Sequence, residues 1–149
     1  MDVKQKVARL SQLRRLQKEV DLLSQRMGEL ELASKGGTGH VTGLPGRPPM
    51  GCTAQYRRLW LKLDDRRFRC MQLMGALYTF ICDIDDSLIR QIMIYRYIDG
   101  LTWKEVAAAI GETDEQYPRR LHNHFLAITP LPRGAERALD EPLEGRNEG

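Results

Sequence analysis

Arginine, glutamine and asparagine side chains gather between residues 115 and 124, and such side chains read guanine and adenine in the major groove of DNA. At 100° per residue on a helix, they project away from, or lie beside, a stripe formed by Tyr117 and Leu121. The candidate DNA-contacting residues of this segment are Gln116, Arg119, Arg120, His122 and Asn123. We therefore expect a DNA-binding surface along one face of the segment.

Catalysis is not expected from the remaining chemical groups. His122 and His124 lie two residues apart, so their side chains project about 200° from each other on a helix and cannot share a metal ion or relay a proton. Neither has a cysteine or carboxylate at a ligand or catalytic spacing. We expect His122 to be exposed and His124 to pack near Phe125, with no metal and no cofactor.

Two short predicted helices and a tight turn position the DNA-contacting side chains. Thr102 and Glu105 form a Thr-x-x-Glu capping box, which predicts that a helix begins at Thr102. Gly111 can turn left-handed at the end of this helix, and Thr113 is a candidate cap for the next one. A turn of about three residues between such helices favours a helix-turn-helix over about residues 101–126. The alternative is an ordinary helical hairpin in an all-helical core.

Pro118 decides where the second helix begins. A proline inside a helix removes a hydrogen bond and clashes with the preceding turn, but the first turn tolerates it. We therefore expect the second helix to begin late, with Pro118 in its first turn. The residues from Arg119 onward stay well placed in that case, whereas Glu115 and Gln116 fall in the turn.

Two long predicted helices come earlier in the chain. Apolar residues at alternating steps of three and four, Leu13–Leu30, form a coiled-coil seam on a helix of residues 3–32. This helix must pair with a second copy or fold back on later helices, and the sequence does not separate the two. The other helix spans about residues 54–81. Arg66 and Arg67 on its polar face are candidate phosphate contacts, although a solvated face is the commoner role of such a charge run.

The predicted fold is all-α and has four parts. These are a coiled-coil helix (residues 1–33), a linker (34–51), a helical domain (52–128) and a disordered tail (129–149). Six glycines and three prolines interrupt the linker, and the tail is acidic with few apolar residues. The three aspartates between residues 83 and 86 have no histidine partner, so we expect them to cap a helix rather than to bind metal.

The formal net charge of +3 is unevenly distributed. Residues 52–77 carry six basic and two acidic side chains, whereas residues 101–126 carry three basic and four acidic ones. Because phosphate neutralisation supplies much of the affinity for DNA, that affinity must come from the local placement of arginines, from the basic helix upstream or from a second copy of the chain. The three cysteines form no Cys-x-x-Cys pair, and the longest apolar run is too short for a membrane span. We expect no secretory signal and reduced thiols. A cytoplasmic protein without a membrane role is expected.

One string of residues also carries a family resemblance. It reads Ile89-Arg-Gln-Ile-Met-Ile-Tyr-Arg-Tyr-Ile-Asp-Gly-Leu-Thr-Trp-Lys-Glu-Val-Ala, followed by Gly111 and by Arg-Arg-Leu-His at residues 119–122. Through it, the region Leu63–Leu126 resembles the sigma-factor region-4-like proteins of phages and prophages, including ArpU-type late transcription regulators. The long N-terminal helix and the glycine-rich joint are similar to that group. The resemblance implies a helix-turn-helix that acts on promoters in double-stranded DNA, with RNA polymerase as a second partner. It does not imply catalysis.

The sequence therefore favours a DNA-binding transcriptional regulator that forms a homo-oligomer. One alternative is a small terminase-like DNA-packaging subunit that assembles into a ring through its coiled coil. The other is a helical oligomer that does not bind DNA. Oligomeric state and sequence preference on DNA separate the first two, and absence of DNA binding identifies the third.

Overall fold

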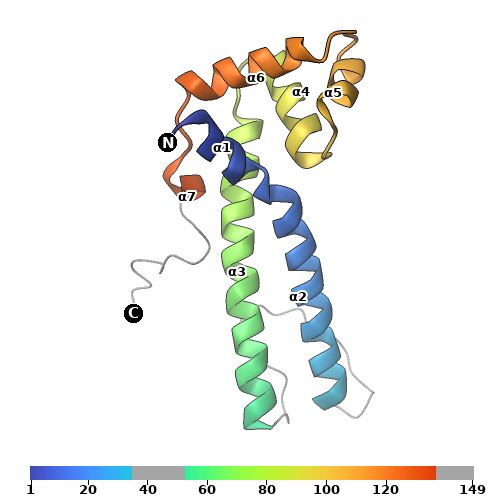
Figure 1. Ribbon diagram of the computed structural model, residues 1–149. Helices are drawn as coiled ribbons and strands as arrows, with labels where there is room; N and C mark the ends of the chain where they lie inside the picture. The colour runs from blue at the N-terminus through green and yellow to red at the C-terminus, as the bar shows by residue number, and fades with distance from the viewer. Residues whose placement is uncertain (35–52, 137–149) are drawn as a thin grey trace. The chain divides into compact units, whose positions relative to one another are not determined.

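The computed structural model describes residues 1–34 and 53–136, and every regular element in these ranges is helical (Figure 1). In chain order the elements are α1 (Val3–Leu10), α2 (Gln12–Ser34), α3 (Ala54–Cys82), α4 (Ser87–Met93), the π-helix η1 (Ile94–Ile98), α5 (Trp103–Ala109), α6 (Gln116–Ile128) and α7 (Arg133–Glu136). The all-α fold class and the long N-terminal helical segment are confirmed. Within these ranges no helix has the length and apolar character needed to cross a membrane. Nearly all of the predicted linker lies outside the described residues.

The chain divides into two compact units, each described by itself. Unit 1 comprises Met1–Arg14 and the chain from Leu73 onward, and unit 2 comprises Arg15–Gln72. The compact units thus divide the chain differently from the predicted domains, because the first residues pack with the C-terminal helices. The contact is specific, since the buried ammonium group of Lys6 donates to the carbonyl oxygens of Leu126 and Thr129, at 2.6 and 2.8 Å.

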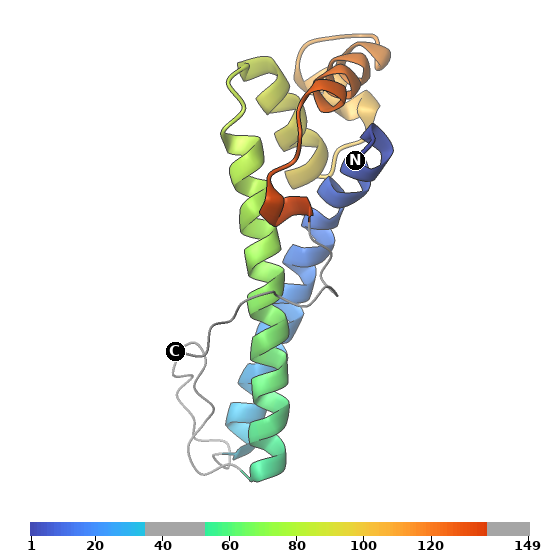
Figure 2. The ribbon, with the colours of Figure 1, turned by 90° about the vertical axis from the view of Figure 1, so that its left-hand side faces the viewer.

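Unit 2 contains most of α2 and the first part of α3, which lie side by side (Figures 1 and 2). Leu16 and Met27 of the predicted seam are buried in it. The Nε atom of Arg66 on α3 donates to the carboxylate of Glu19 on α2 at 3.1 Å, which joins the two helices. The seam therefore has a partner in the same chain, and of the two predicted arrangements the structure shows the one that folds back.

A break at Ser11 divides the predicted N-terminal helix into α1 and α2. The apolar residues Val3, Val7 and Leu10 are one residue out of step with the seam that begins at Leu13. An unbroken helix would rotate the two stripes apart, because side chains share a face only at steps of three and four. The break falls where the step changes, and both Leu10 and Leu13 are buried.

Unit 1 gathers the remaining helices around α6, against which α1, α4 and α5 all pack. Its core is made of aliphatic and aromatic side chains from each of these helices, from η1 and from the end of α3: Leu10, Leu77, Ile81, Ile92, Met93, Tyr97, Val106 and Leu126. The Asp86 carboxylate begins α4 by accepting the amides of Leu88 and Ile89, at 2.9 and 3.1 Å. One of the three aspartates is thus a helix cap, as predicted.

The first part of the predicted disordered tail is ordered, which corrects that prediction. Leu131 is buried, and α7 follows it. A Cβ atom added to Gly134 would lie 3.2 Å from the side chain of Ala76, so α7 lies close against α3. One buried leucine after two exposed or half-buried residues was too weak a pattern to predict this packing. Residues 137–149 lie outside the described part of the chain.

Candidate nucleic-acid interface

Thr102 begins α5, as predicted, and supports the first helix of the candidate DNA-reading pair. Its side-chain oxygen accepts the backbone amide of Glu105 at 3.3 Å. The Glu105 carboxylate then accepts a hydrogen bond from the Thr102 hydroxyl at 3.0 Å, and not from the backbone amide that a full capping box uses. The start of the helix is therefore confirmed, with one of the two predicted bonds changed.

Gly111 ends α5 in the left-handed conformation that was predicted for it, with φ of +81°. Its amide donates to the carbonyl of Ala108 at 3.2 Å, and the amide of Glu112 donates to that of Ala107 at 2.8 Å. This pair of bonds satisfies two of the carbonyls that a helix end leaves without partners. A Cβ atom at Gly111 would touch nothing within 4 Å, so the conformation, and not space, favours glycine here.

α6 begins at Gln116, which places Pro118 in its first turn as predicted. Two details of the prediction are wrong. Thr113 does not cap the helix, because the Gln116 amide donates instead to the Asp114 carboxylate at 2.9 Å. Gln116 is the first residue of the helix and does not lie in the turn. The connection, Ile110–Glu115, is longer than the predicted three residues because proline delays the helix start.

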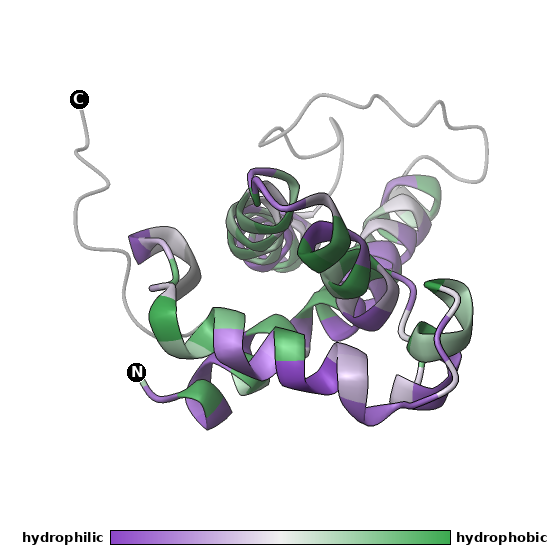
Figure 3. Cartoon of the chain, turned by 90° about the horizontal axis from the view of Figure 1, so that it is seen from above, coloured by the Kyte–Doolittle hydropathy of each residue, from purple (hydrophilic) through white to green (hydrophobic). Residues whose placement is uncertain are grey.

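The outer face of α6 carries four of the five predicted DNA-contacting residues. Gln116, Arg119, Arg120 and Asn123 are all exposed. Within the described part of the chain, neither Arg119 nor Arg120 forms an ion pair or a hydrogen bond, so their guanidinium groups face solvent. Figure 3 shows α6 as an alternation of hydrophilic and hydrophobic segments, as expected for a helix with one buried and one exposed face.

His122, the fifth predicted residue, is only 1% exposed and cannot reach DNA, which corrects its assignment. Its Nε2 atom bonds the Tyr97 hydroxyl at 2.5 Å, and its Nδ1 atom bonds the Asn123 side-chain oxygen at 2.9 Å. The indole of Trp103 meets its ring edge-on, with centroids 4.8 Å apart. The expectation for His124 is reversed as well, because that side chain is exposed.

Burial also determines the protonation state of this histidine. It lowers the pKa of His122 below the ordinary value of 6.5, and the hydrogen bond to Asn123 offsets this only in part. Burial likewise raises the pKa of Tyr97 far above its ordinary value. Both groups are therefore neutral near pH 7. The sequence signal that could have found His122 is the four-residue step from Pro118 through His122 to Leu126, since all three are buried.

Arg66 and Arg67, the predicted phosphate contacts of the basic helix, belong to unit 2 and have acidic neighbours. Arg66 pairs with Glu19, and Arg67 pairs with Asp64, each at 3.1 Å. Their charges are thus partly neutralised inside the unit. Three other basic side chains of α3 are exposed and form no ion pair with a described residue: Arg57, Arg58 and Lys62.

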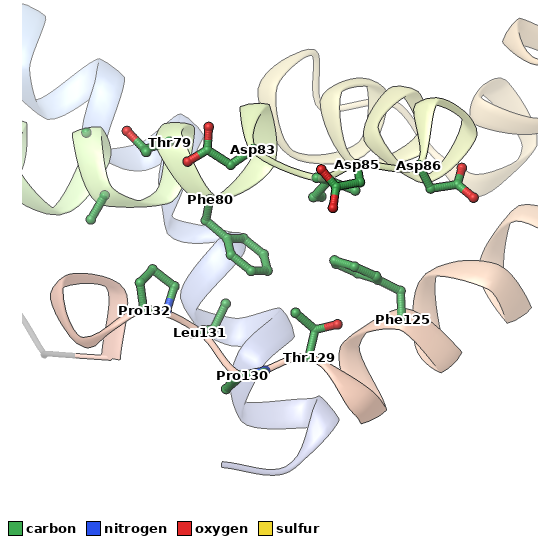
Figure 4. A pocket seen from close by; sticks show the side chains of 13 residues that line it. Thr79, Phe80, Asp83, Asp85, Asp86, Phe125, Thr129, Pro130, Leu131 and Pro132 are labelled. Carbon is green, nitrogen blue, oxygen red and sulfur yellow. The ribbon is translucent and has the colours of Figure 1, made fainter.

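A groove of about 840 Å³ in unit 1 lies between the end of α3 and the connection from α6 to α7 (Figure 4). Its walls are mainly apolar, and they include the rings of Phe80 and Phe125, whose centroids are 6.1 Å apart. Three aspartates, Asp83, Asp85 and Asp86, lie along one side. Because carboxylates repel phosphate groups, this groove is not part of the candidate DNA surface.

Comparison with known proteins adds no assignment, since no protein-family model, curated protein or solved structure matches the chain. The described residues contain no group of three or more histidine, cysteine or acidic side chains that could hold a metal ion. The geometry and charge of α5 and α6, and of the elements that pack against them, are therefore the features that bear on function.

Proposed function

We propose that the protein is a DNA-binding transcriptional regulator of the phage or prophage type, which reads double-stranded DNA with α5 and α6 as a sigma region-4-like helix-turn-helix. The observation that carries the proposal is the outer face of α6, where two unpaired arginines lie with Gln116 and Asn123. Guanidinium and amide groups are the usual readers of guanine and adenine edges. RNA polymerase as a second partner, a homo-oligomeric assembly and a cytoplasmic location belong to the same proposal.

The elements around α6 favour a rigid reading surface. α5 packs against α6 on its buried side, and a capped start and a left-handed end fix the length of α5. Trp103 is half-buried between His122 and the guanidinium group of Arg96, so it supports the structure rather than stacking on a base. A helix held in this way keeps its outer side chains in place, which sequence reading requires.

The charge of the reading segment needs compensation. Glu112, Asp114 and Glu115 lie in the connection before α6 and repel phosphate groups. Within unit 1, however, the first fourteen residues carry four basic side chains and one acidic one, and α1 packs on α6. The N-terminal segment thus adds positive charge to the unit that holds the reading helix, a contribution that we did not predict from the sequence.

The packaging alternative gains no support from the fold. Its ring was expected to form through the N-terminal seam, and seam residues Leu16 and Met27 are buried within unit 2. A ring would need another surface. A homo-oligomer of the regulator would need another surface for the same reason, but reading DNA with α6 does not depend on assembly, so we advance the regulator as the proposed function.

The test uses a double Arg119→Ala/Arg120→Ala variant and duplexes selected from a random pool by the parent protein. Loss of Arg119 should cost roughly 1–3 kcal/mol on selected sites, and loss of Arg120 should weaken binding to all sequences and reduce the salt slope by about one. An Arg15→Ala/Lys18→Ala variant removes the same charge from two exposed positions of α2, where no phosphate contact is predicted, and serves as the matched control, which should keep the sequence preference of the parent. A folded Arg119/Arg120 variant that binds the selected duplexes as tightly as the parent would falsify the proposal.

A further inference from the structure

A small cavity of about 190 Å³ in unit 1 has two arginines in its wall. Its lining residues are Ser11, Arg14, Arg96, Tyr97 and Gly100, which we call the arginine pocket. The residues come from the break between α1 and α2, the start of α2, η1 and the turn after η1. Among the described residues, no carboxylate pairs with either arginine. The pocket therefore combines two positive charges with no acidic group in its lining.

Backbone carbonyl groups hold both guanidinium groups in place. The Nη1 atom of Arg14 donates to the carbonyl of Ile98 at 3.1 Å, and that of Arg96 donates to the carbonyl of Leu101 at 2.9 Å. The Arg96 guanidinium group also lies over the indole of Trp103, with its Cζ atom 4.8 Å from the ring centroid. A guanidinium group has five N–H donors, so each of these bonds leaves donors for a ligand.

Gly100 makes the position of Arg14 possible. Its φ of +71° is one that other residues rarely adopt, and a Cβ atom there would lie 2.6 Å from Cδ and Nε of Arg14. Any side chain at residue 100 would push the arginine away. The adjacent η1 is a π-helix, a form that occurs frequently at functional sites.

We propose that the arginine pocket binds a single phosphate group. Arginine presents a planar fork of donors that matches phosphate oxygens, and the Ser11 hydroxyl adds a further donor. The cavity has room for the group and a few waters, since a water occupies roughly 30 Å³ of liquid. The bonds to the carbonyls of Ile98, at the end of η1, and of Leu101, in the turn after it, account for one donor of each arginine, but not for a pocket whose lining holds no acidic side chain.

The phosphate group can come from two sources. One is the DNA backbone, in which case the inference rests on the proposed function and adds a phosphate contact to the same unit as the reading helix. The other is a free phosphate or a small phosphorylated molecule, in which case the pocket is independent of DNA. Both sources present the same tetrahedral oxyanion to the two guanidinium groups.

The first measurement is a titration of the full chain with inorganic phosphate, followed by amide NMR shifts, with chloride at matched ionic strength as the reference. We expect saturable shifts at the amides of Ser11 and Gly100, and at least fivefold weaker binding in Arg14→Gln. An Arg15→Gln variant, which removes the next exposed arginine along the chain, should leave the affinity unchanged. Arg96 is not substituted, because it also packs on Trp103. Ser11→Ala is the second variant, and it should weaken binding without loss of fold.

The second measurement is the salt dependence of DNA binding by the same variants. A salt slope reduced by about one in Arg14→Gln identifies the DNA backbone as the source of the phosphate group. An unchanged slope in Arg14→Gln, together with saturable phosphate binding by the parent that Arg14→Gln weakens, identifies a free phosphate or a small phosphorylated molecule as the source. The phosphate titration needs no DNA, so it stands even if the Arg119/Arg120 test contradicts the proposed function. Absence of saturable shifts, or shifts that are equal in the parent, Arg14→Gln and Ser11→Ala, would overturn the inference.

Discussion

Replacing Tyr97 with phenylalanine removes one hydroxyl group from the middle of unit 1. That hydroxyl bonds the Nε2 atom of His122 at 2.5 Å, and the two side chains are only 3% and 1% exposed. The other ring nitrogen of His122 donates to the Asn123 side-chain oxygen, which can only accept. Nε2 therefore carries the lone pair, and the Tyr97 hydroxyl satisfies it.

The size of the effect follows from burial. Phenylalanine keeps the ring and its packing, but it leaves Nε2 of His122 without a donor in a place where water has almost no access. A buried acceptor without a partner costs about 1–3 kcal/mol. For a domain of roughly 60–100 residues, each kcal/mol lowers the melting temperature by about 4–8 °C. We therefore expect Tyr97→Phe to lower the melting temperature of unit 1 by roughly 5–20 °C.

The assays are thermal unfolding, which gives the melting temperature, and urea unfolding, which gives the free energy, each followed by the fluorescence of Trp103, which contacts His122 directly. A Trp60→Phe background in every variant removes the signal of the tryptophan in unit 2. Tyr56→Phe is the matched control, because it removes the same atom from a side chain that is 42% exposed. If the two variants lose equal stability, or Tyr97→Phe loses less than about 0.5 kcal/mol, the hydroxyl does not satisfy His122 and the reasoning is refuted.

Three further predictions concern the same unit. Burial lowers the pKa of His122, so near pH 6 the unfolded chain binds a proton that the folded chain does not. The free energy of unfolding should therefore fall as the pH drops below about 6.5, by at most about 1.4 kcal/mol per pH unit. Urea midpoints that stay flat down to about pH 5.5 would contradict this. Lys6→Met should lower the free energy of unfolding in urea by at least about 1.5 kcal/mol, because two carbonyls at the end of α6 lose a charged donor. Lys4→Met, at an exposed position, should leave it almost unchanged. Thr102→Ala should cost about 1 kcal/mol in thermal melting, because it removes a helix cap, and an equal loss in Thr113→Ala would show that the cap assignment is wrong.

Local signals were sufficient to predict where α5 begins and ends. A hydroxyl cap, a glycine at the helix end and the backbone limits of proline act over a few residues, so their effect can be deduced without knowledge of the fold. The same holds for Asp86 at the start of α4. The exposed face of α6 was predicted almost completely, because helical periodicity separates its arginines from the apolar stripe.

Long-range contacts decided what the sequence could not. His122 seemed free to face solvent because its main partner, Tyr97, lies 25 residues earlier in the chain and on another helix. The choice between self-pairing and folding back needed the pairing of Glu19 with Arg66, which are 47 residues apart. Opposite charges on two amphipathic helices are too common for such a pair to be recognised from spacing alone.

The N-terminal segment shows how these long-range contacts bear on function. Lys6 holds carbonyls at the end of α6, and Arg14 holds a carbonyl at the end of η1, so two cations stabilise the ends of two helices of the unit that carries the candidate reading surface. Carbonyl ends of helices carry partial negative charge, which makes cations their natural partners. Residues 1–33 are thus not a separable coiled coil. A deletion of these residues would remove both the support for α6 and the positive charge of the N-terminal segment, so a loss of DNA binding after it would not report on self-association. The oligomeric state must therefore be measured on the intact chain.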